Sequence, residues 1–355
     1  MWNCSVRMAG ELNFLRHYLD GLDKQDYLLG LKAEACGDCT KQIKQFQDHF
    51  RSSNNKTHYE YTTVIISLYG YLERFIEDLI SEYLSLISDH INTFAELPKS
   101  IQDKHFDLSV ELVRKADSQR YADSVRPPEI IARLHACFQT PEKYELNHQA
   151  FSHHSANFRQ SVVRTTFATL GISDIGQLLR QAEPFTCFLS GEDTERDLEI
   201  YLAGQDDVLF ARLNDLADRR NDLAHGAPVD DILSRDLLRS YIAFIEAYSS
   251  GLALAIYESA LPSLLNRAVR LGNAIEVYNS SIVCVDLPTG QITVGDTLIA
   301  KTRDQRRPFK GGRINEIQRD RTPLITVDGG PGVRVGMSVD FGVKENHEFS
   351  SVRLR

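Results

Sequence analysis

The hydrophobic positions divide the 355-residue chain into a long helical part and a short strand-rich part. Over residues 11–264, apolar residues recur at intervals of three and four and glycines are few, which is typical of amphipathic helices. From residue 275 to the end, β-branched and polar residues alternate in short runs, separated by turn sequences such as Pro-Thr-Gly and Gly-Gly-Pro-Gly. Several strands with no helix between them predict a small antiparallel barrel or sandwich.

Within the helical part, the spacing of apolar residues predicts individual helices. A first helix reaches to about Phe50, and the polar stretch RSSNNKTHYE separates it from a long helix over residues 61–91. Prolines in the middle of the chain indicate short helices and loops. Further helices are expected over residues 155–170, with a stop at Gly171, and over residues 206–225.

The change of pattern near residues 271–273 sets the main domain boundary. We expect an N-terminal helical extension in residues 1–56, a helical bundle in residues 57–272, and an antiparallel β-barrel in residues 273–355. The predicted fold class is therefore α plus a separate small all-β domain.

Composition limits the kind of partner and compartment. The net charge of −9 means that no basic field covers the whole chain, so a polyanionic ligand must be bound by a local patch. The first residues interleave charges throughout and lack the apolar core of a signal peptide. Residues 241–265 are the longest apolar stretch, but Glu246 and Glu258 interrupt it, which predicts a buried helix and no membrane partner. We expect a cytoplasmic protein.

The six cysteines are scattered without a disulfide framework, which fits a reducing compartment. Cys36 and Cys39 have the spacing of metal ligands or of a redox pair. A zinc site requires two more ligands at matched spacing, and the sequence has no second CxxC and no nearby HxxxH. We expect two helical thiols, no metal site and no cofactor.

The helix expected over residues 206–225 carries an arginine in its apolar stripe. The positions that recur at alternating intervals of four and three are Leu209, Leu213, Leu216, Arg220 and Leu223. A guanidinium cannot be neutralised, so it needs an acceptor in the groove that it faces, unless its long side chain carries it to solvent. Asn221 and His225 lie four residues apart on one face, and Arg220 can reach the same point.

These three side chains suit the cleavage of RNA without a metal. His225 is the last helical residue before Gly226. A histidine can transfer the proton of the 2′-hydroxyl or of the leaving 5′-oxygen, while Arg220 and Asn221 stabilise charge on the phosphate. The ordinary structural alternative is a histidine that complements the helix dipole and an Arg220 that forms an ion pair.

Residues 220–225, RNDLAH, resemble the RNxxxH motif of the HEPN ribonuclease superfamily. Two further segments, LYGYLERFIEDLISEYL and LHACFQTPEKYELNHQAFSHHSANFRQSVV, and their spacing before the motif resemble its RiboL-PSP-HEPN branch. The resemblance covers residues 57–257. It implies a HEPN-like bundle that forms a homodimer, in which two motifs face each other in one RNA-cleaving cleft, with Arg220, Asn221 and His225 as the catalytic residues.

The same resemblance suggests supporting residues. Glu73, in YLERF, matches a position where related proteins often carry an acidic or polar residue, and it is a candidate partner of Arg220 or Asn221. A solvated helix charge is the alternative. Asn157 and Arg159, in HSANFRQ, are candidate supporting or phosphate contacts, with helix capping and surface charge as alternatives. His153 and His154 are weaker candidates for a functional role than Asn157 and Arg159.

The C-terminal segments QITVGDTLIAK and RINEIQRDRTPLITVDGGPGVRVGMSVDFGV resemble the second-domain β-barrel of translation elongation factors. The chain has no GxxxxGK[ST], so it is not a translation GTPase. Residues 301–321 carry eight Lys/Arg against three Asp/Glu. This run supplies the candidate RNA-binding residues Lys301, Arg303, Arg306, Arg307, Lys310 and Arg313. A solubilising loop is the alternative, because the run has a single aromatic residue.

Taken together, the sequence predicts a metal-independent, homodimeric endoribonuclease of the kind that acts as a toxin or phage-defence effector. An antitoxin or another regulatory protein is a further candidate partner. The alternatives are a non-catalytic HEPN-like scaffold, an RNA- or ribosome-binding module, and an antitoxin-like regulator. The complete RNxxxH motif favours the enzyme, because a scaffold has no physical need for all three side chains.

Overall fold

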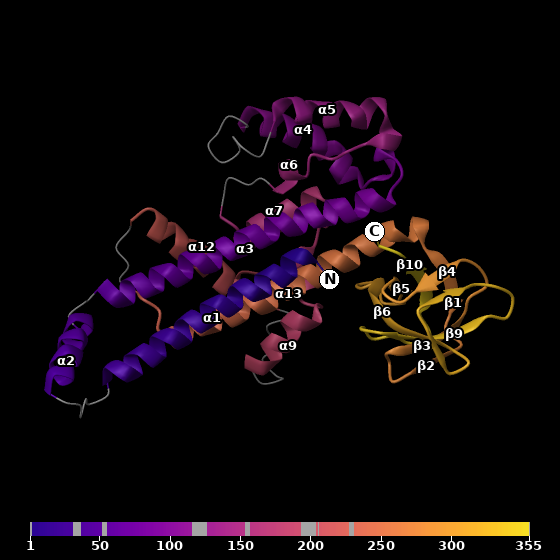
Figure 1. The fold of residues 1–355 in the computed structure, drawn as a ribbon. Coiled ribbons are helices and arrows are strands. Elements are labelled where there is room, and N and C mark those ends of the chain that lie inside the picture. The colour runs from indigo at the N-terminus through magenta and orange to yellow at the C-terminus, as the bar shows by residue number, and fades with distance from the viewer. Residues whose placement is uncertain are drawn as a thin grey trace. The chain divides into compact units, whose positions relative to one another are not determined.

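The computed structural model describes residues 2–30, 37–51, 55–115, 126–152, 157–192, 204, 206–226 and 231–354. Helices account for the regular structure up to Leu264, and antiparallel strands follow from Val269 (Figure 1). This order confirms the predicted fold class of a helical N-terminal region followed by a small all-β region.

The helices are α1 (Asn3–Gly30), α2 (Gly37–Arg51), α3 (Asn55–His90), α4 (Lys99–Lys115), α5 (Pro127–Gln139), α6 (His148–Ser152), α7 (Gln160–Thr169), α8 (Ile175–Leu179), α9 (Glu183–Glu192), α11 (Asp206–Leu209), α12 (Ala211–Ala224) and α13 (Arg235–Leu264), with the short 3-10 helices η1 (Phe94–Glu96), η2 (Pro141–Lys143) and η3 (Leu265–Arg267). The strands are β1 (Val269–Asn273), β2 (Glu276–Tyr278), β3 (Ile282–Asp286), β4 (Gln291–Thr293), β5 (Thr297–Lys301), β6 (Phe309–Arg319), β7 (Thr322–Leu324), β8 (Thr326–Asp328), β9 (Arg334–Val339) and β10 (Glu348–Val352).

The chain forms two compact units, and each consists of three segments that alternate along the sequence. The first unit contains Met1–Leu79, His154–Thr165 and Ala182–Ala253. The second contains Ile80–His153, Thr166–Gln181 and Leu254–Arg355. The long helices α3 and α13 therefore each contribute residues to both units.

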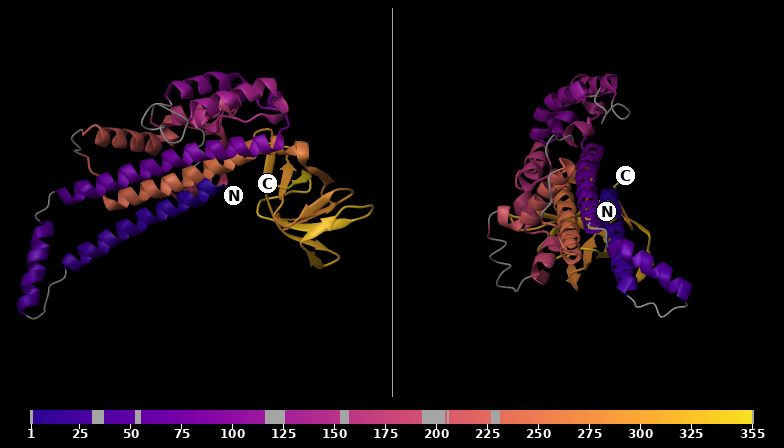
Figure 2. Two further views of the ribbon diagram at one scale, coloured as in Figure 1. Left: turned by 45° about the horizontal axis from the view of Figure 1, so that its top comes forward. Right: turned by 90° about the vertical axis from the view of Figure 1, so that its left-hand side faces the viewer.

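Three long helices form the body of the first unit. Figures 1 and 2 show α1, α3 and α13 running side by side. One apolar face of α3 is buried along this unit, with Val64, Leu68 and Leu72 fully inaccessible to solvent. Because these positions recur at intervals of four, one stripe of α3 can contact its neighbours over several turns.

The structure differs from four of the predicted helix boundaries. The helix expected to reach Phe50 is two helices, α1 and α2, and the residues between Gly30 and Gly37 lie outside the described part of the chain. The long helix expected from residue 61 begins at Asn55, so the second half of the polar stretch RSSNNKTHYE is helical. The helix expected from residue 155 begins only at Gln160. The helix expected over residues 206–225 is interrupted at Phe210, whose fully buried ring stacks on Phe185. Tertiary packing therefore overrides the local helical pattern there.

The second unit contains the sheet. Its strands lie in the order β1-β10-β5-β6-β9-β3-β2, with antiparallel pairing throughout, and β7 adds to β6. Strands β4 and β8 form a separate antiparallel pair. Alternate residues of β9 are buried, which matches the period of two read from the sequence. The sheet is a half-barrel whose inner face contributes Val283, Leu298, Ile314 and Met337 to one apolar core.

In the part of the chain that the structure describes, no helix is both long enough and apolar enough to cross a membrane.

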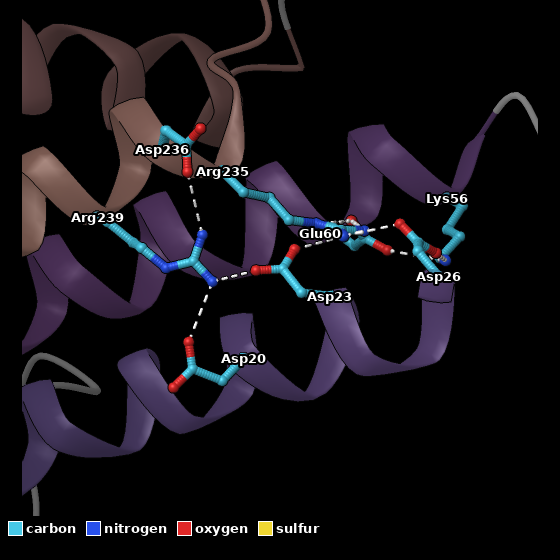
Figure 3. Close-up of polar contacts among 8 residues, drawn as sticks. All are labelled: Asp20, Asp23, Asp26, Lys56, Glu60, Arg235, Asp236 and Arg239. Carbon is cyan, nitrogen blue, oxygen red and sulfur yellow. Dashed lines mark hydrogen bonds and ion pairs between the residues drawn. The ribbon is translucent and has the colours of Figure 1, made fainter. Parts of the chain in front are cut away.

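A network of ion pairs joins the three long helices of the first unit (Figure 3). Arg235, at the start of α13, donates to Asp23 of α1 at 2.9 Å and to Glu60 of α3 at 2.7 Å. It also lies 2.7 Å from Asp26, which in turn pairs with Lys56 at 2.6 Å. The Glu60 side chain is only 9% exposed, so its charge depends on these cations.

Arg239, one turn after Arg235, pairs with Asp20, Asp23 and Asp236 in a more exposed setting. Hydrogen bonds from Arg239 and Arg235 lower the pKa of Asp23. A carboxylate whose pKa is lower in the folded chain contributes stability above its unfolded pKa, and that stability is lost as the pH falls through the folded value. The contribution of Asp23 is therefore present at neutral pH and lost in acid.

We predict that Arg235→Met lowers the free energy of unfolding by about 2 kcal/mol, because it removes both hydrogen bonds that Arg235 donates to Oε2 of the buried Glu60. The matched change Arg239→Met should cost less than about 1 kcal/mol, since its partners are exposed. Urea denaturation of both variants at pH 7 and at pH 3 measures this, and the cost of Arg235→Met should shrink at pH 3, where aspartates become protonated. Equal costs for the two variants would contradict the burial argument.

Candidate functional site

Helix α12 places Arg220 at the edge of the core of the first unit. Leu216 and Leu213, one and two turns earlier in the same stripe, are fully buried, whereas Arg220 is half-buried. The guanidinium carbon of Arg220 lies 5.1 Å from the centre of the Tyr69 ring, over its face. Its Nη1 donates to Asn157 Oδ1 at 3.1 Å. The partners of Arg220 are therefore an aromatic ring and a neutral amide. Among the described residues, no carboxylate accepts a hydrogen bond from Arg220.

Asn157 joins two residues of the motif. Its Oδ1 accepts from Arg220, and its Nδ2 donates to Asn221 Oδ1 at 3.3 Å and to the carbonyl oxygen of Ala217 at 3.5 Å. The structure therefore brings Asn157, Arg220 and Asn221 together.

Residues 157–160, which lie just before α7 and include its first residue, hold α12 in place. We call them the NFRQ segment. Arg159 forms an ion pair with Asp218 of α12, in which its Nε lies 3.0 Å from Asp218 Oδ1. The backbone N–H of Gln160 donates to Asn214 Oδ1 at 3.0 Å, one turn earlier on α12. The Arg159 guanidinium thus faces a carboxylate of its own chain.

Tyr69 of α3 lies beneath Arg220, and its side chain is 1% exposed. Its hydroxyl oxygen accepts a hydrogen bond from the backbone N–H of Phe158 at 2.8 Å. Burial and, to a smaller extent, the charge of Glu73 raise the pKa of Tyr69 to about 12, while the hydrogen bond from Phe158 and the charge of Arg220 oppose the shift. The phenol is therefore neutral at physiological pH and offers Arg220 an intact aromatic face.

Glu73 lies one turn after Tyr69 on α3 and is half-buried. Its charge acts on the Tyr69 hydroxyl, which places it on the side of α3 that faces this site. Its predicted role as a partner of Arg220 or Asn221 stays a prediction.

His225 ends α12 as its C-terminal cap, and its backbone N–H donates to the carbonyl oxygen of Asn221 at 3.1 Å. Gly226 follows with φ +69°, the left-handed conformation in which glycine commonly ends a helix. The imidazole of His225 is exposed, so solvent and a ligand can reach it.

Arg219, the neighbour of Arg220, has a different environment. It donates to Asp215 Oδ2 at 2.6 Å, to the Tyr61 hydroxyl at 3.0 Å, and to the carbonyl and carboxylate oxygens of Asp231 at 2.8 and 2.6 Å. Burial disfavours its charge, but these bonds outweigh burial and raise the pKa of Arg219. Arg219 therefore ties α12 to α3 and to the chain before α13, while Arg220 keeps N–H groups that have no acceptor among the described residues.

The basic run of the half-barrel is divided in the structure. Arg307 forms a bidentate ion pair with Glu258, with both bonds at 2.6 Å, and it also donates to the carbonyl oxygen of Gln181. Burial, followed by the charge of Arg307, lowers the pKa of the half-buried Lys310. The remaining candidate residues Lys301, Arg303, Arg306 and Arg313 are exposed. Arg307 is thus held by a carboxylate, which the sequence pattern did not reveal.

Sequence reasoning missed Tyr69 and the backbone N–H of Phe158. The sequence could have identified Tyr69, because it lies four residues before Glu73 in the segment LYGYLERF and therefore shares its helix face. Cys36, His153 and His154 lie outside the described residues. Among the residues that are described, no three His, Cys, Asp or Glu side chains are close enough together to hold a metal ion.

Comparison with known families places the candidate site within a matched region. The family model described as RiboL-PSP-HEPN matches residues 34–258, a range that contains the Arg220 motif, the NFRQ segment and Tyr69. No curated protein matches the chain. The matched range starts before residue 57, the first residue of the region whose sequence resembles the family. It ends next to residue 257, the last residue of that region.

We predict that the two adjacent arginines differ in their contribution to stability. Arg219→Met should lower the free energy of unfolding by about 2 kcal/mol, because it removes the hydrogen bond to the buried Tyr61 hydroxyl and one of the two that Asp215 Oδ2 accepts, the other coming from Tyr241. Arg220→Met should cost about 1 kcal/mol or less, since it removes one hydrogen bond to a neutral amide. Chemical denaturation of the two variants measures the difference, and a larger cost for Arg220→Met would show that Arg220 has mainly a structural role.

Proposed function

Because the chain belongs to the RiboL-PSP-HEPN family, whose HEPN domain indicates an RNA-related, nuclease-type function, we propose that it is a metal-independent endoribonuclease. The observation that carries this proposal is the pairing of Arg220 and Asn221 through Asn157 beside an exposed His225. Arg220, Asn221 and His225 are the proposed catalytic residues. These side chains can transfer protons and stabilise phosphate charge without a metal.

In the proposed reaction, the 2′-oxygen of the RNA attacks the adjacent phosphorus and the 5′-oxygen of the next nucleotide leaves. A base removes the proton of the 2′-hydroxyl, and an acid protonates the leaving 5′-oxygen. The products are a 2′,3′-cyclic phosphate and a 5′-hydroxyl. Arg220 and Asn221 donate hydrogen bonds to the phosphate oxygens, whose negative charge grows in the transition state.

A homodimer suits this chemistry. The reaction transfers one proton to a base and one from an acid, while each chain has a single motif histidine, His225. Two chains that bring their motifs together supply two imidazoles, and either one can act as acid or base. We therefore propose a composite site, in a toxin or phage-defence effector that an antitoxin or another regulatory protein restrains.

The exposed basic residues of the half-barrel are the proposed RNA-holding surface. Lys301, Arg303, Arg306 and Arg313 can neutralise phosphates in any sequence context, because they offer charge without base-reading geometry. Arg307 is excluded from this surface by its bidentate bond to Glu258.

We expect the purified protein to cleave RNA in excess EDTA. Arg220→Ala and His225→Ala should each lower the rate by at least about 100-fold, since each removes a group that acts on the transition state. Gel analysis of total cellular RNA measures cleavage, with circular dichroism to confirm that the variants fold. Asp222→Ala, an exposed change within the same motif, is the control and should leave cleavage within about twofold of wild type. Loss of wild-type cleavage on adding EDTA would contradict the proposed chemistry.

We also expect the double variant Arg303→Glu/Arg306→Glu to weaken RNA binding and to reduce its dependence on salt, because it removes phosphate contacts. Fluorescence anisotropy with a labelled single-stranded RNA at several salt concentrations, in a His225→Ala background, measures binding without cleavage. Gln305→Ala, an exposed change in the same loop that alters no charge, is the control and should leave affinity and salt dependence unchanged. Unchanged affinity and salt dependence in the charge-reversed variant would show that the half-barrel is not part of the RNA-binding surface.

A further inference from the structure

We propose that Tyr69 and Asn157 are positioning residues, which set the direction in which Arg220 and Asn221 donate to the RNA phosphate. This inference rests on the proposed ribonuclease function. Neither residue touches the reacting atoms in this account, since both act through the two motif residues.

The permanent charge of Arg220 determines the orientation of the amides around it. A guanidinium can only donate hydrogen bonds, so the amide oxygen of Asn157 must face Arg220. The amide nitrogen of Asn157 then faces Asn221 and requires an acceptor there, which is Asn221 Oδ1. The Nδ2 group of Asn221 is thereby turned away from Asn157, and it has no acceptor among the described residues. Asn157 thus leaves Asn221 as a donor toward a ligand.

Tyr69 fixes the plane of the Arg220 guanidinium. The ring is buried and is held at its hydroxyl by the N–H of Phe158, the residue after Asn157. A guanidinium over an aromatic face is stabilised by the ring while the N–H groups at its edges stay available. Because Asn157 takes Nη1, the remaining N–H groups of Arg220 can donate to two oxygens of one phosphate.

One short segment therefore sets both contacts. The side chain of Asn157 and the backbone of Phe158 are adjacent in the chain, and they fix Arg220, Asn221 and Tyr69 together. Since donors that are oriented before the reaction act most strongly on the charge that develops in the transition state, their misorientation should lower kcat more than it changes KM.

The test compares two changes at each position by steady-state cleavage of a defined RNA. Tyr69→Leu removes the aromatic face and should lower kcat by about 10- to 100-fold with KM within about threefold of wild type. Tyr69→Phe keeps the face, loses only the hydrogen bond from Phe158, and should lower kcat less than Tyr69→Leu. Asn157→Asp keeps an acceptor for Arg220 but cannot donate to Asn221, so the Asn221 amide turns its nitrogen inward. It should therefore lower kcat as Asn157→Ala does. Thermal unfolding confirms that each variant folds.

The outcomes separate this inference from the proposed function. If Arg220→Ala is inactive while Tyr69→Leu and Asn157→Asp cleave with wild-type kcat, the positioning role is wrong and the ribonuclease proposal stands. If the wild type does not cleave RNA, the proposed function fails, and NMR still tests the contact that underlies positioning. The Arg220 Nε–Hε signal, assigned by its loss in Arg220→Lys, should shift in Tyr69→Leu and stay near its wild-type position in Tyr69→Phe. An unchanged signal in both variants would overturn the inference.

Discussion

The site is built around a charge that cannot be removed. Arg220 occupies the apolar stripe of α12, and a guanidinium in that position must be stabilised by its surroundings at every physiological pH. The first unit stabilises it with the face of Tyr69 and the amide oxygen of Asn157, both of which are uncharged at neutral pH. A carboxylate would hold the same arginine more strongly and would also cancel its charge. Neutral partners leave the positive charge available to an anionic ligand.

The remainder of the first unit keeps α12 in position. Arg219 ties α12 to α3 and to Asp231, and the NFRQ segment contacts α12 on successive turns. Beyond them, the ion pairs of Arg235 join α13 to α1 and α3. The contrast between Arg219 and Arg220 shows how two neighbouring arginines can divide their roles, because the first is surrounded by acidic and hydroxyl acceptors and the second by an aromatic ring and an amide.

Sequence patterns could predict the elements and the motif, but not the contacts between distant segments. The periods of 3.6 and two residues identified the helical and β regions, and Gly226 correctly marked the end of α12. The stripe position of Arg220 showed that a partner was needed. The sequence did not reveal which residues are the partners, because Tyr69 and Asn157 lie far from Arg220 in the chain and contact it only in the folded structure. The Glu258 partner of Arg307 was hidden for the same reason, since local charge counting cannot find a carboxylate that a distant helix supplies.

The chemical nature of the cleaved ends distinguishes attack by the 2′-oxygen of the RNA from attack by water. Mass spectrometry of oligonucleotides released by the purified protein in EDTA identifies both new termini. Attack by the 2′-oxygen, assisted by His225 and stabilised by Arg220 and Asn221, predicts 2′,3′-cyclic phosphate and 5′-hydroxyl ends. Fragments that carry 3′-hydroxyl and 5′-phosphate ends would show that water attacks the phosphorus, and they would contradict this account of the site.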